Sequence, residues 1–99
     1  MKLIVLKSAV TDIKEINKYL CEFGQQPARK FRQSVEKFRE QVVNTPYMYP
    51  EYAPLPEYRR AILEYGYLLF YKVDEEIDRI KIYRVLHGKQ QPSLHLHLS

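Results

Sequence analysis

Hydrophobic residues in the first half of the chain recur at the spacing of amphipathic helices. Two series advance by three or four residues at a time, so that each series lines one face of a helix. The first predicted face consists of Ala9, Ile13, Ile16, Leu20 and Phe23, and the second of Ala28, Phe31, Val35, Phe38 and Val42. A short apolar run at Leu3–Leu6 comes before them and predicts a first strand within residues 1–7.

The predicted helices carry residues that suit helix ends. Ser8 is expected to cap the first helix, since its hydroxyl can accept a hydrogen bond from a free backbone N–H of the first turn. Gly24 is expected to end that helix in the left-handed conformation, and Pro27 to occupy the first position of the second helix. The two helices then form an antiparallel hairpin within residues 8–45, which Asn44-Thr45-Pro46 ends.

The second half of the chain has the pattern of β-strands. Residues 46–57 are too rich in proline for a helix and too aromatic for a free linker, so we expect an ordered connection there. Runs of β-forming residues follow, with turns at Tyr65-Gly66 and at Asp74-Glu75-Glu76. The predicted strands of this meander, within residues 58–89, are Tyr58–Glu64, Tyr67–Val73 and Ile77–His87.

The C-terminal residues 90–99 show no core periodicity apart from an alternation of leucines at Leu94, Leu96 and Leu98. We expect a loose tail or an added edge strand. His95 and His97 offer two imidazoles, which are too few ligands for a metal site.

The order of the predicted elements is β-α-α-β-β-β, which indicates a single α+β domain over residues 1–99. Two layers are expected, with the N-terminal helical hairpin packed on a four-stranded, mainly antiparallel sheet. In the last strand one parity is expected to face the helices, at Ile80, Ile82 and Leu86, and the other parity carries Lys81, Tyr83, Val85 and His87. Arg84 has the apolar parity, so we expect it to lie at the end of the sheet or to be paired.

The amino-acid composition indicates where the protein is located and what kind of partner it binds. Basic residues outnumber acidic residues by 16 to 12, and the formal charge is +4. Cations are expected to gather at the strand ends, where they would meet a polyanion or an acidic partner. These residues are Arg59, Arg60, Arg84, His87 and Lys89. A single cysteine excludes an internal disulfide, and the first apolar run is too short for a signal peptide or a membrane span. We therefore expect a cytoplasmic protein without membrane contact.

The whole pattern resembles the RelE/ParE superfamily of bacterial toxins from type II toxin–antitoxin systems. The resemblance rests on the helical hairpin, the segment PYMYP at residues 46–50 and the strand pair LLFYKVDEE and IKIYRVLHGKQ. Within the superfamily the chain is most similar to the ParE-like, plasmid-stabilisation branch. Lysine stands at Lys72 and Lys89, where that branch typically has arginine, and lysine lacks the bidentate guanidinium.

The resemblance implies a partner and two alternative activities. A cognate antitoxin, acidic and partly disordered when free, wraps such toxins, and we expect it to use the sheet face and a helix groove. ParE-like members inhibit DNA gyrase by binding, whereas RelE-like members are ribosome-dependent nucleases that cut messenger RNA. No cofactor or metal is implied. A toxin homodimer and a toxin–antitoxin hetero-oligomer both remain open, and so does a non-toxic interaction module of the same fold.

Candidate site residues differ between these alternatives. RNA cleavage requires an acid and a base together with cations that stabilise the phosphorane, and its candidates here are His87, Arg84, Arg60 and Lys89. The residues expected to bind the target or the antitoxin are Arg59, Arg60, Tyr71, Tyr83, Arg84, His87 and Lys89. Many RelE-like nucleases have a tyrosine or a further arginine just beyond the last strand. In this chain neither residue follows Lys89. The sequence therefore favours an inhibitor that is not an enzyme, with a hydrogen-bonding, structural role for His87.

Overall fold

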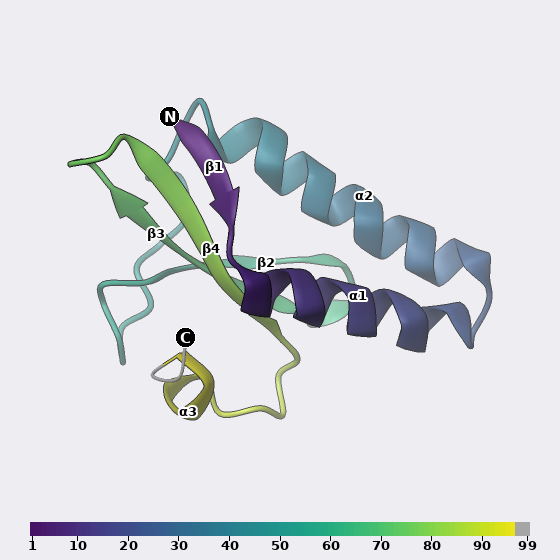
Figure 1. Cartoon of the computed structure of the whole chain (residues 1–99). Coiled ribbons are helices and arrows are strands. Elements are labelled where there is room, and N and C mark those ends of the chain that lie inside the picture. Colours follow the sequence, from purple (N-terminus) through teal and green to yellow (C-terminus); the bar gives the residue numbers. More distant parts are fainter. Residues whose placement is uncertain (97–99) are drawn as a thin grey trace.

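The computed structural model describes residues 1–96, without the side chains of residues 93 and 94, and confirms the predicted α+β architecture. The elements are β1 (Lys2–Val5), α1 (Lys7–Cys21), α2 (Gln25–Val42), β2 (Arg59–Ile62), the 3₁₀ turn η1 (Glu64–Gly66), β3 (Leu68–Asp74), β4 (Arg79–Leu86) and α3 (Pro92–Leu96). The sheet has the strand order β1-β4-β3-β2, in which β1 is parallel to β4 and the other pairs are antiparallel. Both long helices cover one face of this sheet (Figure 1).

The hairpin face, as we call the sheet face under α1 and α2, holds the larger apolar cluster. All five residues of the predicted α2 face are buried in it, as are Leu69, Tyr71, Ile80 and Ile82 of the sheet. From α1, Ala9 and Leu20 are buried and Ile13 and Ile16 are partly buried. Phe23 is 64% exposed, because α1 ends at Cys21 and the predicted face does not continue beyond it. Its placement in the core was wrong.

Three helix-end predictions require correction. The N-cap of α1 is Leu6, and Ser8 lies inside the helix, where its hydroxyl donates to the Tyr83 carbonyl of β4 at 2.8 Å. Gly24 has φ 113° and acts as the N-cap of α2, while α1 has already ended in a right-handed C-cap. Glycine is suited to this short reversal between two helices because it has no Cβ. Pro27 is the third residue of α2, a position in the first turn where the missing N–H is still tolerated.

The observed strands are shifted by one or two residues from their predicted limits, since the turns are wider than the sequence suggested. The first turn combines two left-handed residues, Tyr65 with φ 62° and Gly66 with φ 76°. The second turn lies after Asp74, which belongs to β3, and includes Asp78 with φ 55°. The connection at residues 46–57 is ordered and non-helical, as predicted. Tyr49 packs against Phe38 and Tyr71 of the hairpin face.

A β-bulge in β4 changes which side chains face the helices. Phe70 pairs with Arg84, but Tyr71 pairs with Ile82, so Tyr83 is an extra residue in β4. Beyond this bulge the parity is inverted. Val85 therefore lies in the cluster of the hairpin face and Leu86 does not, so both predicted orientations were wrong.

The opposite face of the sheet, here called the tail face, has its own small cluster of Tyr58, Phe70, Leu86 and Leu96. Leu96 belongs to α3, which covers part of this face and replaces the predicted loose tail or edge strand. The hydroxyl of Tyr58 donates to the Leu96 carbonyl at 3.2 Å and so helps to hold α3 in place. The predictions for His97 and Leu98 lie outside the described residues.

Candidate functional site

Arg59 is held by the proline-rich connection. Its guanidinium donates to the carbonyl of Tyr49 at 2.7 Å and to that of Tyr47 at 3.5 Å. It also lies 3.8 Å from a Glu51 carboxylate oxygen and 4.9 Å from the centroid of the Tyr47 ring. These contacts fasten the connection to the start of β2, so Arg59 orders this segment of the protein.

Arg59 and Arg60 point to opposite faces of the sheet, as their adjacency in one strand predicts. Arg59 pairs across the strands with Tyr71 of the hairpin face, and Arg60 pairs with Phe70 of the tail face. The Arg60 guanidinium lies over the ring of Tyr52, 5.8 Å from its centroid. The two arginines therefore do not contribute to one shared site.

Arg84 is occupied by Asp12 of α1. The guanidinium donates from Nε to Asp12 Oδ2 at 2.7 Å and from Nη2 to Oδ1 at 2.9 Å, which is a bidentate pair. A further donation from Nη1 reaches the carbonyl of His95 at 3.4 Å. The hydrogen-bonded carboxylate of Asp12 raises the pKa of Arg84 above its ordinary value. The expectation that Arg84 is paired is confirmed, although the bulge turns it away from the predicted parity.

Asp12 is a structurally important residue that sequence reasoning missed. Besides Arg84 it accepts the backbone N–H of Val85 at 3.0 Å, and Ser8 bonds the neighbouring Tyr83 carbonyl. Because β1 ends at Val5, this part of β4 has no strand on its β1 side, and polar side chains of α1 satisfy its backbone there instead. The one sequence signal for Asp12 was the unexplained cation at Arg84.

His87 and Lys89 follow β4 beside a groove under α1. The His87 ring accepts the backbone N–H of Lys89 at Nδ1, 3.2 Å away, and the backbone N–H of His87 donates to Gln90 Oε1 at 3.1 Å. These bonds order the loop after β4, as expected for a structural histidine. The groove has a volume of about 590 Å³ and is lined by Asp12, Glu15, Ile16, Tyr19, Tyr67, Val85, His87, Lys89 and Gln90.

The two tyrosines assigned to binding have different surroundings. Tyr71 is completely buried, its hydroxyl donates to the Pro46 carbonyl at 2.7 Å, and burial raises its pKa to about 12. Tyr71 is therefore inaccessible to a partner in this structure, which corrects its assignment. Tyr83 packs edge-on against Tyr58, and the Lys72 ammonium lies 5.0 Å and 4.5 Å from the centroids of these two rings.

The expected cluster of five cations does not form. Arg59 is on the hairpin face, Arg84 is paired with Asp12, and Arg60 lies over Tyr52. Of the candidates for RNA cleavage, His87 and Lys89 lie together at the α1 groove, whereas Arg84 and Arg60 are engaged elsewhere, so the full set does not surround one reacting phosphate. No group of residues in the described part of the chain could hold a metal ion.

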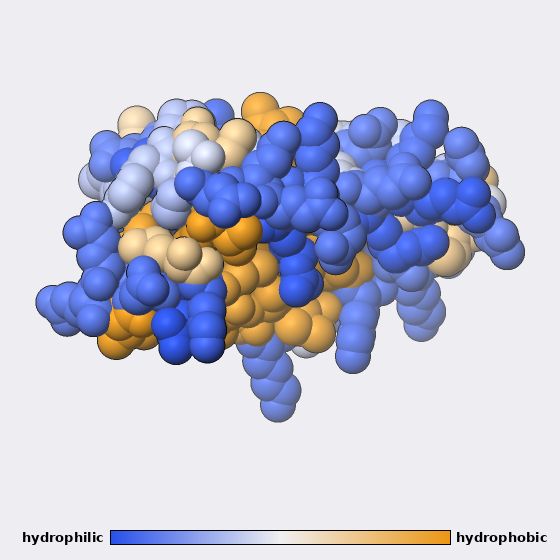
Figure 2. Space-filling view, turned by 90° about the horizontal axis from the view of Figure 1, so that it is seen from above, coloured by the Kyte–Doolittle hydropathy of each residue, from blue (hydrophilic) through white to orange (hydrophobic). Residues whose placement is uncertain are grey.

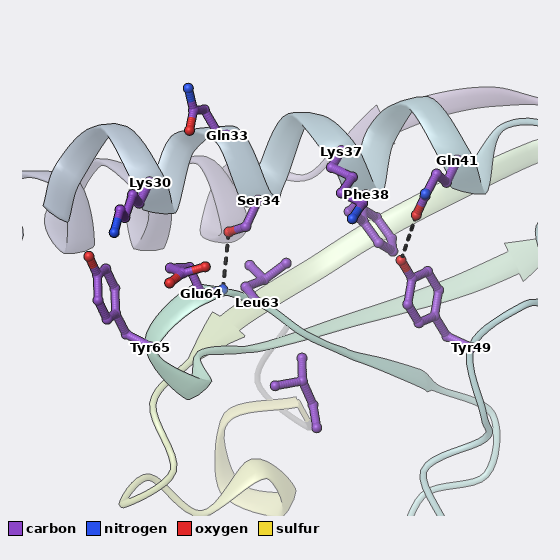
Figure 3. A pocket seen from close by; sticks show the side chains of 11 residues that line it. Lys30, Gln33, Ser34, Lys37, Phe38, Gln41, Tyr49, Leu63, Glu64 and Tyr65 are labelled. Atoms are coloured by element: carbon purple, nitrogen blue, oxygen red, sulfur yellow. Dashed lines mark hydrogen bonds between the residues drawn. The ribbon is translucent and has the colours of Figure 1, made fainter. Parts of the chain in front are cut away.

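A larger groove, which the sequence did not locate, runs between α2 and the end of β2 (Figure 3). Its volume is about 760 Å³, and its lining residues are Lys30, Gln33, Ser34, Lys37, Phe38, Gln41, Tyr49, Ile62, Leu63, Glu64 and Tyr65. The backbone N–H of Glu64 donates to Ser34 Oγ at 3.2 Å across this groove. Over the helical hairpin the surface is mainly hydrophilic (Figure 2), and within residues 1–96 no helix has the length and apolarity to span a membrane.

Comparison with known proteins identifies the family. A family model described as the ParE toxin of the type II toxin–antitoxin system parDE matches residues 3–92. No curated protein sequence matches the chain. Among solved structures, the fold is similar to that of a chain from the chromosomal ParDE toxin–antitoxin system of P. aeruginosa, with a TM-score of 0.69 and 24% identity over 88% of this chain and 95% of that chain. The family model covers most of the sequence, and this chain therefore belongs to the ParE toxin family of type II toxin–antitoxin systems.

Proposed function

We propose that this protein is a toxin that inhibits DNA gyrase by binding to it and that a cognate antitoxin neutralises it. The observation that carries the proposal is the match to the ParE toxin family over residues 3–92. A member of this family belongs to a toxin–antitoxin pair. The activity that the resemblance implies for this branch is inhibition of DNA gyrase. A cytoplasmic location follows from that target.

The arrangement of the basic residues favours inhibition by binding over catalysis. In the nuclease alternative, Arg84 would have to stabilise a phosphorane, but both ends of its guanidinium fork are bonded to Asp12. Releasing it would leave two largely buried charges without partners, which costs several kcal/mol. Of the candidate cations, Lys89 then lies beside His87 in the α1 groove without an arginine to help stabilise the phosphorane of 2′-hydroxyl cleavage.

A supercoiling assay tests the proposal. Purified toxin is added to DNA gyrase, ATP and relaxed plasmid, and we expect loss of supercoiling at micromolar toxin, with activity restored by the antitoxin encoded beside the toxin gene. His87→Ala should retain the inhibition, since the ring only orders the loop after β4.

Mapping of transcript ends after induction provides the opposing result. New RNA ends that disappear in His87→Ala, together with undisturbed supercoiling, would replace this proposal with a ribosome-dependent nuclease. Unimpaired growth after induction without antitoxin would instead identify a non-toxic interaction module.

A further inference from the structure

β2 is the outer strand of the sheet, and part of its outer edge is open. Leu63 donates its N–H to the Tyr67 carbonyl on the β3 side at 2.7 Å, so the backbone groups of the preceding residue, Ile62, point the other way. Earlier positions of this edge are already occupied, because the N–H of Arg60 donates to the Pro50 carbonyl at 3.1 Å. Within residues 1–96, no such backbone bond is found at the edge for Ile62.

The open position faces the α2 groove and is bounded on both sides. On one side the connection covers Arg60, and on the other the N–H of Glu64 is bonded to Ser34 of α2. Figure 3 shows Ser34 and Glu64 spanning the groove between the helix and the end of the strand. An added chain therefore has room for one residue pair at Ile62 before it meets groups that are already bonded.

The walls of this groove are positively charged. Lys30 and Lys37 lie seven residues apart on α2, which corresponds to roughly 10 Å along the helix axis. Among the described residues, neither lysine takes part in an ion pair, and Glu64 is the one carboxylate of the lining. The groove is thus complementary in charge to a segment that carries carboxylates.

Two exposed side chains beside the open edge also indicate a partner. Ile62 is 66% exposed, and an apolar residue on an unpaired edge strand promotes aggregation unless something covers it. Tyr65 is 52% exposed and has φ 62°, a strained conformation for a bulky residue. Strain of this kind is retained mainly at functional positions. Figure 3 shows the Tyr65 ring rising from the turn toward Lys30, at one end of the groove.

We propose that an extended, acidic segment of the antitoxin adds to β2 at Ile62 and pairs with its backbone N–H and C=O. Side chains of an extended strand alternate between two faces. Carboxylates on one face of the segment enter the groove toward Lys30 and Lys37, and an aliphatic residue on the other face covers the Ile62 side chain, which shares the tail face with Leu68. This inference rests on the proposed function and names the chemistry by which the antitoxin is recognised.

Binding of the purified antitoxin to toxin variants tests the charge requirement. The double variant Lys30→Glu with Lys37→Glu should weaken binding by about tenfold or more, mainly through slower association whose salt dependence is reduced. The matched control is Lys14→Glu with Lys18→Glu, two exposed residues of α1 outside the groove lining that change the net charge equally. The control should bind within about twofold of the wild type, because surface charges far from an interface have little effect.

Hydrogen exchange of the wild-type toxin tests the backbone pairing without any mutation. Antitoxin binding should slow exchange of the Ile62 amide by at least about tenfold, as expected for a newly formed strand hydrogen bond. The inference is overturned if the antitoxin binds but Ile62 exchange is unchanged, or if the groove and control variants lose equal affinity. Failure of the wild-type toxin to bind the antitoxin would instead overturn the proposed function itself, and this inference with it.

Discussion

On the hairpin face, two long helices with regular apolar stripes cover the sheet, whereas the tail face is covered by a short terminal helix and by an irregular connection. The hairpin face buries residues from α1, α2, β2, β3 and β4, and partly buried residues of β1 pack against them. The tail-face cluster consists of four buried residues, one of which comes from α3. This difference indicates that the hairpin face supplies most of the stability and that the tail face can open locally, since small peripheral clusters unfold at lower cost.

The largest effect should come from Phe38→Ala on the hairpin face. Phe38 is almost completely buried and packs edge-on against Tyr71. Removal of a buried phenyl ring costs about 4 kcal/mol through lost transfer free energy and a residual cavity. Urea denaturation followed by circular dichroism measures the change, and a loss below about 1 kcal/mol would contradict the assignment of this face as the main core.

Asp12→Ala should cost about 3 kcal/mol, because it leaves the Arg84 guanidinium largely buried without its partner. Asp12 joins α1 to β4 at the edge of the sheet, so this variant examines the junction between the two faces. Replacing both residues, Asp12→Ala with Arg84→Met, should recover part of the stability, since no unpaired charge remains. A double variant as unstable as the sum of the two single variants would show that the pair is not coupled.

Alkaline pH should weaken the hairpin face through Tyr71. Burial raises the pKa of Tyr71 to about 12 from its ordinary value of 10.0, so folding favours the neutral phenol. Stability is therefore complete below pH 10 and is lost as the pH rises toward 12, by about 2 kcal/mol for a shift of this size. Urea denaturation at intervals of about half a pH unit between pH 8 and pH 12 measures the free energy of unfolding. It should fall less steeply with pH for Tyr71→Phe than for the wild type. An unchanged slope would mean that the phenol ionises without unfolding.

Leu96→Ala on the tail face should have the smallest effect, about 1 to 2 kcal/mol, even though Leu96 is as well buried as Phe38. α3 has five residues and lies close to the C-terminus, so it can detach while the sheet stays folded. Limited proteolysis should then cleave this variant near α3 and leave the hairpin intact. A loss of stability equal to that of Phe38→Ala would show that the two faces unfold together.

The sequence predicted the hairpin face better than the tail face, because the hairpin face is built from long regular helices. The α2 stripe from Ala28 to Val42 was correct in every position, because its periodicity is local and each residue of it meets the sheet. The bulge at Tyr83 has no glycine or proline to mark it, so the faces of Val85 and Leu86 were inverted beyond it. α3 was missed because its helix depends on the docking of Leu96 against Tyr58 and Phe70, which are distant in sequence.

The candidate site was less predictable than the fold. Arg84 was recognised as a cation that required an explanation, but its partner Asp12 lies 72 residues away, in a helix that also carries Glu15. Tyr71 belongs to the strand LLFYKVDEE that carries the resemblance, and the structure uses it, together with Arg59, to hold the connection at residues 46–57. The α2 groove depends on where β2 ends beneath α2, and this position is set by the tertiary fold.

The pairing of β1 with β4 has a consequence for synthesis of the protein. β1 is made first, yet within residues 1–96 it pairs with β4, the last of the four strands in chain order. A nascent chain that has reached only the end of α2 holds the apolar stripes of both helices with no sheet to cover them. Such late, long-range closure slows folding and exposes the chain to aggregation. The sheet can therefore close over both helices only after β4 has been translated up to Leu86, and until then the apolar stripes of α1 and α2 stay accessible to other chains.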